Sequence, residues 1–387
     1  MDKYTVTFGG WYQRTTLHLS EIYDFLSSGT SRLPLSDKKL AELFVALDIE
    51  KVTREVENLE FVSAVTSHGI HIRYYEDGLY VLNYETDDVS STKRLLTNYF
   101  ENLFEPAISY IFSLGAPTPK VLANIKSHHP TVATLKRKNP EDFKVNERYG
   151  KVYSKIDAGN VSVYKTHPYI FVVSNTSSQH LRNLSETQIF FREFKDQLEK
   201  YLNIHRNIWE EIAEIKEKGV VKGGDVAELR SKLDGYQKTI DLIKNRINQM
   251  GAYIGTRRSI AKNASVEDEL VSLFQYKFET LSDTHSYIKE LWKMTENYLD
   301  SAIKIIVEIE NQSTNVSIRS LQLITTVGVL SGILAYLARN EFPKLSLVGA
   351  SYFLILVFAT WGINKLVWKY YQRKKYKVRF TDRTKNI

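Results

Sequence analysis

The sequence predicts an α/β domain, followed by a long α-helical stalk and a two-helix transmembrane hairpin. Residues 1–178 alternate segments rich in Val, Ile, Tyr and Thr with segments of helical periodicity, which is typical of an α/β or α+β domain. Residues 179–315 have helical periodicity throughout. Charged residues make up 25% of the chain but become rare between Val316 and Trp368, which indicates a membrane segment.

The α/β domain is expected to contain short strands and two helical segments. Helical periodicity covers Asp37–Leu59 and Val89–Leu114, and Pro106 is expected to break or kink the second segment because proline lacks the backbone N–H. The segments of strand composition are Tyr4–Phe8, Ile70–Tyr84, Lys151–Ile156, Val161–Tyr164 and Tyr169–Val173.

Three helices are expected in the stalk, residues 179–315. The first covers about 185–218, and the second covers about 225–250 and is followed by two glycines. The third begins near Asn263 and would be about 110 Å long if it continued to Ala338. Its apolar positions recur mostly at steps of three or four: Leu270, Phe274, Phe278, Leu281, Ile288, Trp292, Leu299, Ile303, Ile306 and Ile309. Such a helix needs partners, either the two preceding helices or copies of itself in a coiled coil.

Two apolar segments near the C-terminus are predicted to cross the membrane as helices. The first, residues 316–338, contains the uncharged run LQLITTVGVLSGILAYLA. The second, residues 345–368, has Lys365 as its single charge, near its end. A membrane core about 30 Å thick needs about 20 helical residues. The alternative is a pair of helices buried in a soluble core, which the basic flank makes hard to place.

The loop of residues 339–344 is so short that the two spans must be antiparallel. The tail, residues 369–387, carries much of the net charge of +7, and basic residues gather on the cytoplasmic side of membranes. This predicts a multi-pass protein of the cell membrane with the α/β domain and both termini in the cytoplasm. The lipid bilayer is then the expected partner of the basic tail, and no nucleic-acid motif accompanies its charge.

The residue types exclude several classes of site. The chain has no cysteine, which rules out disulfides, thiolate metal sites and cysteine nucleophiles. Gly9-Gly10 and Gly223-Gly224 lack the context of a phosphate-binding loop, and no catalytic triad is recognisable. We therefore predict that the chain is not an enzyme and binds no cofactor.

The order of these parts resembles that of the CorA-type divalent-cation channel family and its ZntB zinc-transporting relatives. Resemblance in residues is confined to about Asn311–Phe342. There, Asn315, Ile318, Arg319 and Leu321 fall on the family's Asn, gating Met, Lys and Leu. The family ends its first span with Gly-x-Asn, which this chain lacks at that place.

The resemblance implies a homopentamer that carries a divalent cation, Mg²⁺ or similar, through a pore lined by the first span. Arg339, Asn340 and Glu341 would form the outer mouth, with Asn340 and Glu341 as the candidate metal ligands. The residues expected to line the pore, at steps of three or four, are Asn315, Ile318, Leu321, Thr325, Val329, Gly332 and Tyr336.

Two functions stay open at this point. The first is a CorA-like oligomeric membrane channel or transporter for divalent metal ions. The second is a non-transporting, membrane-anchored sensor or scaffold that kept the same frame, and the missing Gly-x-Asn favours it. The proposed pore stripe also fits plain helix packing, because Gly328, Ser331 and Gly332 allow close approach of helices.

Overall fold

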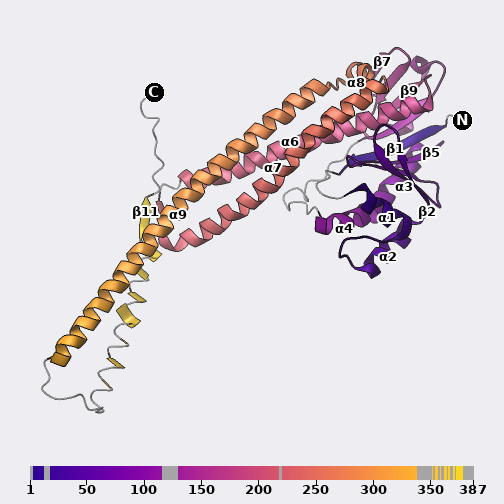
Figure 1. Ribbon diagram of the computed structural model, residues 1–387. Coiled ribbons are helices and arrows are strands. Elements are labelled where there is room, and N and C mark those ends of the chain that lie inside the picture. Colours follow the sequence, from indigo (N-terminus) through magenta and orange to yellow (C-terminus); the bar gives the residue numbers. More distant parts are fainter. Residues whose placement is uncertain are drawn as a thin grey trace, which may run out of the picture. The chain divides into compact units, whose positions relative to one another are not determined.

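The computed structural model describes residues 3–12, 18–115, 130–217 and 220–337, and parts of 351–377. The chain divides into two compact units, Met1–Ile204 with Leu242–Glu290, and His205–Asp241 with Leu291–Ile387. Three long helices contribute to both units: α6 (Ser178–Glu217), α7 (Val226–Asn263) and α9 (Phe278–Leu337) (Figure 1).

The described residues of the first unit form a nine-stranded sheet in the order β2-β3-β4-β5-β1-β6-β9-β8-β7. The strands are β1 (Tyr4–Trp11), β2 (Ile49–Val56), β3 (Glu60–Thr66), β4 (His71–Tyr75), β5 (Leu79–Thr86), β6 (Thr131–Lys136), β7 (Ser154–Ala158), β8 (Val161–Lys165) and β9 (Tyr169–Ser174). Strands β6 and β9 are parallel, and every other pair is antiparallel. The N-terminal strand therefore lies in the middle of the sheet.

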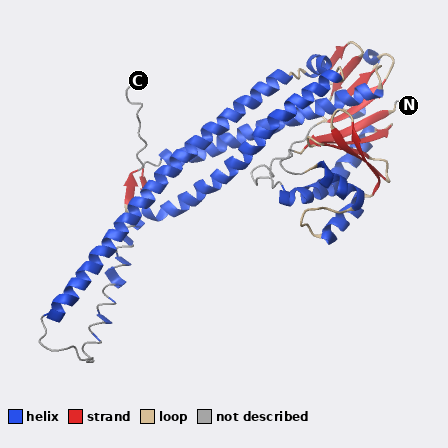
Figure 2. Ribbon diagram, viewed as in Figure 1, coloured by secondary structure: helices blue, strands red, loops and turns tan. Residues whose placement is uncertain are grey.

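Both faces of the sheet are covered by helices. Alternate residues of a strand point to opposite faces. In β1, Tyr4 and Val6 belong to the main hydrophobic core on one face. Gly9 and Trp11 point to the other face, where a Cβ on Gly9 would lie 3.2 Å from Ile189 of α6. The α/β part of the predicted fold is thus observed as a three-layer arrangement (Figure 2).

The helices on the main-core face are α1 (Leu19–Ser28), α2 (Asp37–Leu47), α3 (Val89–Tyr99), the π-helical turn η1 (Phe100–Phe104) and α4 (Glu105–Gly115). Asp88 caps α3, since its side chain accepts a hydrogen bond from the Ser90 N–H. On the other face, α6 contacts β1 through aromatic pairs of Trp11 with Phe190 and Phe194, and Trp11 also contacts Tyr253 of α7.

The second unit is mainly helical. The C-terminal part of α6, the N-terminal part of α7 and α9 from Leu291 supply its buried apolar side chains, which include Ile208, Ile212, Leu233, Ile240, Leu299 and Ile306. The connection between α6 and α7 contains β10 (Val220–Lys222), which pairs with β11 (Lys375–Lys377) near the C-terminus. Most of the described residues between Ser178 and Leu337 are therefore helical, apart from β10 and the connections between the helices.

Two helix predictions in the α/β domain need correction. The segment Asp37–Leu59 is not one helix: α2 ends where Asp48 adopts a left-handed conformation (φ 53°), and the β-branched residues that follow form β2. In the second segment, Pro106 does not break the helix, since α3, η1 and α4 follow one another with right-handed helical backbone at Phe100 and Glu105. The irregularity is the π-helical turn η1 just before it.

The long helices also differ from the prediction. Gly251 does not end α7, and its missing side chain allows the His285 ring of α9 to approach: a Cβ would lie 3.1 Å from its Cε1. The third helix does not begin at Asn263. A separate helix, α8 (Glu267–Phe274), ends at Gln275, which is left-handed at φ 59°, and α9 begins at Phe278. The 60 residues of α9 extend about 90 Å.

The predicted transmembrane hairpin is wrong for the part of the chain that the structure describes, since none of its helices combines the length and apolar character needed to cross a membrane. The uncharged run of α9 from Leu321 to Leu337 extends about 25 Å, short of the roughly 30 Å of a membrane core. This finding contradicts the hairpin in the predicted fold class, the membrane and transmembrane character, and the multi-pass location with cytoplasmic termini. The loop 339–344 and most of the segment 345–368 lie outside the described residues.

Candidate functional site

The residues predicted to line a pore lie on the C-terminal part of α9, in the second unit. Ile318 and Leu321 are 49% and 53% exposed, and Thr325 and Gly332 are also exposed. The remaining members, which have helical backbone, are Asn315, Val329 and Tyr336. One helix thus carries the whole predicted stripe, and its role in a pore stays a prediction.

The predicted outer mouth, Arg339, Asn340 and Glu341, lies outside the described residues, so the two candidate metal ligands there stay predictions. Within the described ranges, no three His, Asp or Glu side chains are grouped so that they could hold a metal ion.

Large apolar side chains are exposed on both C-terminal segments of the second unit. They lie on α9 and among the described residues of 351–370, and we call them the apolar surface: Ile318, Leu321, Leu330, Leu354, Ile355, Phe358, Trp361, Ile363, Leu366 and Tyr370. Their exposed fractions range from 46% at Ile363 to 69% at Leu366. Large apolar side chains exposed in such number mark an interaction site in a folded protein.

The hydroxyl groups between these side chains do not make the surface polar. Thr325 and Thr326 donate hydrogen bonds to the carbonyl oxygens of Leu321 and Gln322, both at 2.7 Å, and Ser331 donates to that of Gly328 at 2.9 Å. Their donors are thus satisfied within α9. What this part of the helix offers to a partner is mainly hydrocarbon.

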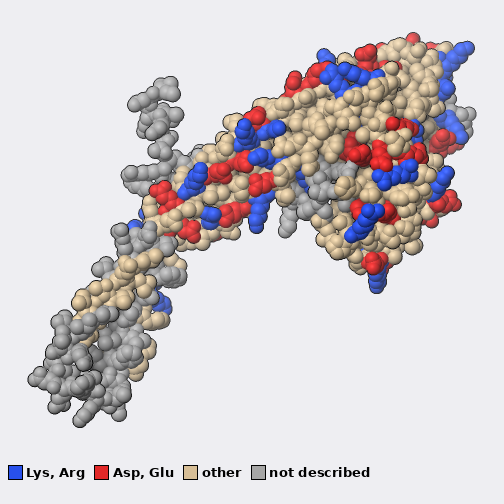
Figure 3. Space-filling model, in the orientation of Figure 1, with Lys and Arg blue, Asp and Glu red and all other residues tan. Residues whose placement is uncertain are grey.

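Charge changes sharply along α9. Acidic and basic residues are frequent up to Glu310, whereas the sequence from Ser320 to Leu337 contains none. Figure 3 shows red and blue side chains on the earlier part of the helix, and the atoms beyond it that are not grey are mostly tan. A partner for the charge-free part must itself be apolar, because it finds no ion-pairing group there.

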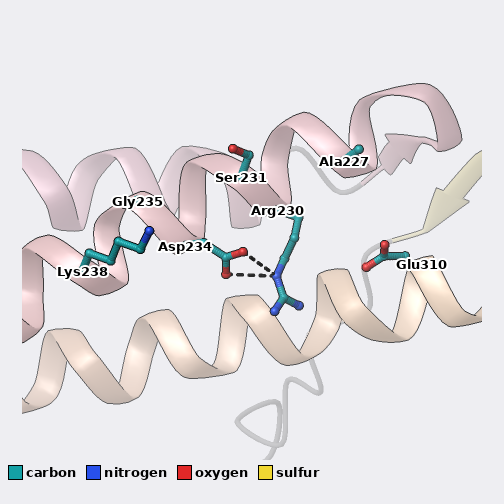
Figure 4. Close-up of a pocket in the computed structure, with 7 residues that line it drawn as sticks. All are labelled: Ala227, Arg230, Ser231, Asp234, Gly235, Lys238 and Glu310. Atoms are coloured by element: carbon teal, nitrogen blue, oxygen red, sulfur yellow. Dashed lines mark hydrogen bonds and ion pairs between the residues drawn. The ribbon is translucent and has the colours of Figure 1, made fainter.

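A shallow pocket of about 570 Å³ lies between α7 and α9 in the second unit. Arg230 and Asp234 of α7 form an ion pair in it, with Nε 3.0 and 3.1 Å from the two carboxylate oxygens, and Glu310 faces them from α9 (Figure 4). The other lining residues are Ala227, Ser231, Gly235 and Lys238. Its charges largely neutralise one another, and it contains no nucleophile–base pair that would indicate catalysis.

The first unit contains a buried polar network that the sequence did not reveal. Glu186 of α6 accepts hydrogen bonds from Arg73 (2.7 Å) and from the Tyr75 hydroxyl (2.5 Å) of β4. Burial, and then the charge of Glu186, raise the pKa of Tyr75 well above its ordinary value. Arg257 of α7 packs on the Tyr75 ring at 4.8 Å and pairs with Asp77. The network joins α6 and α7 to the sheet.

A second buried polar residue is His205, on α6 in the second unit. Its ring stacks on Trp209 (5.9 Å) and meets the Trp292 ring edge-on (6.0 Å). No described hydrogen-bond partner lies within bonding geometry of Trp292 Nε1. Burial lowers the pKa of His205, which keeps the ring neutral among these aromatic side chains.

Comparison with known proteins identifies no relative. No protein-family model matches the chain, and neither the curated proteins nor the solved structures contain a match.

Proposed function

We propose that this chain is a homo-oligomeric scaffold whose copies associate through the apolar surface of α9 and the segment 351–370. Each copy would bring its own α/β domain to the assembly. The observation that carries the proposal is the exposure of ten large apolar side chains in one unit. Of the two functions considered from the sequence, the proposal keeps the non-transporting scaffold. It does not include the membrane anchor.

The helix α9 continues beyond the level at which α7 begins, so its last turns need another partner. The pocket residues place Glu310 of α9 beside Ala227 and Arg230, which lie in the first two turns of α7. Beyond Glu310, α9 continues to Leu337, about 40 Å further, past the level at which α7 begins. The large apolar side chains of α9 in this part, and those of the described residues of 351–370, are exposed.

The energy available from this surface is sufficient for association. Burying the half that is still exposed contributes on the order of 1 kcal/mol for each large apolar side chain, so the ten together contribute on the order of 10 kcal/mol per copy. Association costs about 4–15 kcal/mol in lost freedom of motion. A second copy supplies the matching chemistry, because its own α9 offers the same uncharged surface.

Native mass spectrometry of the full chain in a mild non-ionic detergent tests the proposal. Wild type should be an oligomer, and the resemblance noted in the sequence makes five copies the first expectation. The double variant Leu321→Glu/Leu330→Glu should shift the mass towards the monomer, with a dissociation constant at least about 100-fold higher, because each new carboxylate would have to be buried unpaired.

The matched control is Val45→Glu/Val56→Glu, which adds the same two charges at positions that are 75% and 74% exposed in the first unit. It should leave the mass unchanged. Flotation with phosphatidylcholine vesicles tests whether lipid covers this surface instead of a second copy. A wild-type chain that is monomeric and floats with the vesicles would show that lipid covers it, and the proposal would be wrong.

Cation transport, the other function considered, stays a prediction. It required the membrane hairpin, and the described residues provide no observation that favours it over association.

A further inference from the structure

We infer that β11 is a reversible strap that fastens the C-terminal segment to the connection between α6 and α7, and that the charge on two opposed lysines sets how firmly it closes. This inference does not depend on the proposed oligomer, because both strands belong to the same chain and the same unit.

The pairing of the two strands is specific. Val220, Val221 and Lys222 lie opposite Lys377, Tyr376 and Lys375 in an antiparallel ladder. The Gly223 N–H extends it by donating to the Lys374 carbonyl oxygen at 3.0 Å. The space around Gly224 is also occupied by the C-terminal segment, since a Cβ there would lie 3.5 Å from the Gln372 carbonyl oxygen. The C-terminal segment is therefore held along a continuous stretch of backbone.

One face of this ribbon is buried. Val221 and Tyr376, which are directly opposite each other, are 3% and 6% exposed. Lys374 lies on the same face as Tyr376, two residues away, and its ammonium group is 5.4 Å from the centre of the Tyr376 ring. Burial of the Val221–Tyr376 pair fixes the register, because a slip by one residue would turn both side chains outward.

The other face of the ribbon carries like charges. Lys222 and Lys375 are directly opposite each other and both are exposed. Like charges at opposed positions weaken strand pairing. A two-stranded ribbon of three residues a strand is also marginally stable by itself. The strap should therefore open readily, and neutralising either lysine, or screening both with salt, should close it more firmly.

Disulfide trapping tests the pairing, and the absence of cysteine from the chain makes the test clean. In the variant Lys222→Cys/Lys375→Cys, the two cysteines are directly opposed. The Cα atoms of opposed residues in an antiparallel pair lie about 4.5–5.5 Å apart, which a disulfide can bridge. This variant should form an intramolecular disulfide under mild oxidation. The control Lys222→Cys/Arg373→Cys places the second thiol two residues out of register and should oxidise at least tenfold more slowly.

Hydrogen exchange tests the role of charge. Amides of 220–223 and 375–377 should exchange more slowly in Lys222→Gln than in wild type, and more slowly in wild type at 500 mM than at 25 mM salt. Arg373→Gln removes the same charge from outside the ladder and should change exchange little.

Either of two results would overturn the inference. Equal oxidation of both cysteine pairs, or disulfides only between chains, would show that the strands do not pair in this register within one chain. Exchange that is independent of Lys222 and of salt would show that the opposed charges do not control closure. Association through the apolar surface is read separately from the native mass, which these variants leave unchanged.

Discussion

Arg257 and Asp77 are 180 residues apart in the sequence, and the guanidinium of the first binds the carboxylate of the second through two hydrogen bonds of 2.5 and 2.7 Å. Their side chains are only 3% and 2% exposed. Burial by itself would lower the pKa of Arg257, but the charge and hydrogen bonds of Asp77 outweigh it and raise that pKa. The buried pair joins α7 to the turn between β4 and β5.

Removing one partner of this pair should be costly. We expect Asp77→Asn to lower the free energy of unfolding by about 3–5 kcal/mol, because it leaves the guanidinium buried and uncompensated. Urea denaturation followed by circular dichroism measures the change. The double variant Asp77→Leu/Arg257→Met should lose less, and Glu85→Gln, which breaks the exposed pair with Lys3, should cost under about 1 kcal/mol. Equal losses at Asp77 and Glu85 would contradict this account.

The hydrogen bond from Tyr75 to Glu186 should be individually measurable. Tyr75→Phe removes one donor to a buried carboxylate and should lower the free energy of unfolding by about 1.5–3 kcal/mol. A double-mutant cycle with Glu186→Gln gives the coupling, which should be well above zero. Tyr153→Phe, at a tyrosine that is 60% exposed, serves as the control and should be nearly neutral.

Two glycines should respond to alanine in opposite directions. A Cβ on Gly9 would lie 2.9 Å from the Tyr80 carbonyl oxygen and 2.9 Å from Val81, so Gly9→Ala should cost about 1–3 kcal/mol through overpacking of β1 against β5. Gly235 is inside α7 with no atom within 4 Å of such a Cβ, so Gly235→Ala should stabilise by about 0.5–1 kcal/mol. Thermal denaturation of both variants would show the opposite shifts, and a stabilising Gly9→Ala would refute the close packing.

The lowered pKa of His205 predicts a dependence of stability on pH. The folded chain binds fewer protons at this ring than the unfolded chain, whose histidines titrate near 6.5. The contribution of neutral His205 to stability is therefore complete above about pH 6.5 and is lost as the pH falls below it.

His205→Phe should make the free energy of unfolding less dependent on pH between 7.5 and 5.5, because its ring cannot take up a proton. The charged neighbour that acts on His205 is Arg206 of the same helix, and it also disfavours the protonated ring. Val56→Phe, which adds a ring at a position that is 74% exposed and removes no titratable group, should leave the pH dependence as it is in wild type. If both variants keep the slope of wild type, His205 is not the titrating group.

Local pattern determined much of the architecture. The strands predicted at Val161–Tyr164 and Tyr169–Val173 are β8 and β9, because β-branched and aromatic residues fit a pleated, buried surface. The predicted strand segment Ile70–Tyr84 is the hairpin of β4 and β5, which turns at Gly78, where φ is 90°. The helical character of residues 179–315 was also predicted, since it rests on an apolar periodicity that each segment carries by itself.

Other features were decided by tertiary contacts. Gly251 continues a helix because the His285 ring uses the space of its missing side chain, and a sequence pattern cannot show that neighbour. Part of the basic tail predicted at residues 369–387 is the strand β11, because it pairs with β10. The apolar pattern after Ser320 predicted a membrane crossing, whereas the described helix ends at Leu337 and exposes its apolar side chains. The composition determines that burying such a surface against an apolar neighbour is favourable. The length of the helix and the elements around it in the fold decide which neighbour can cover it.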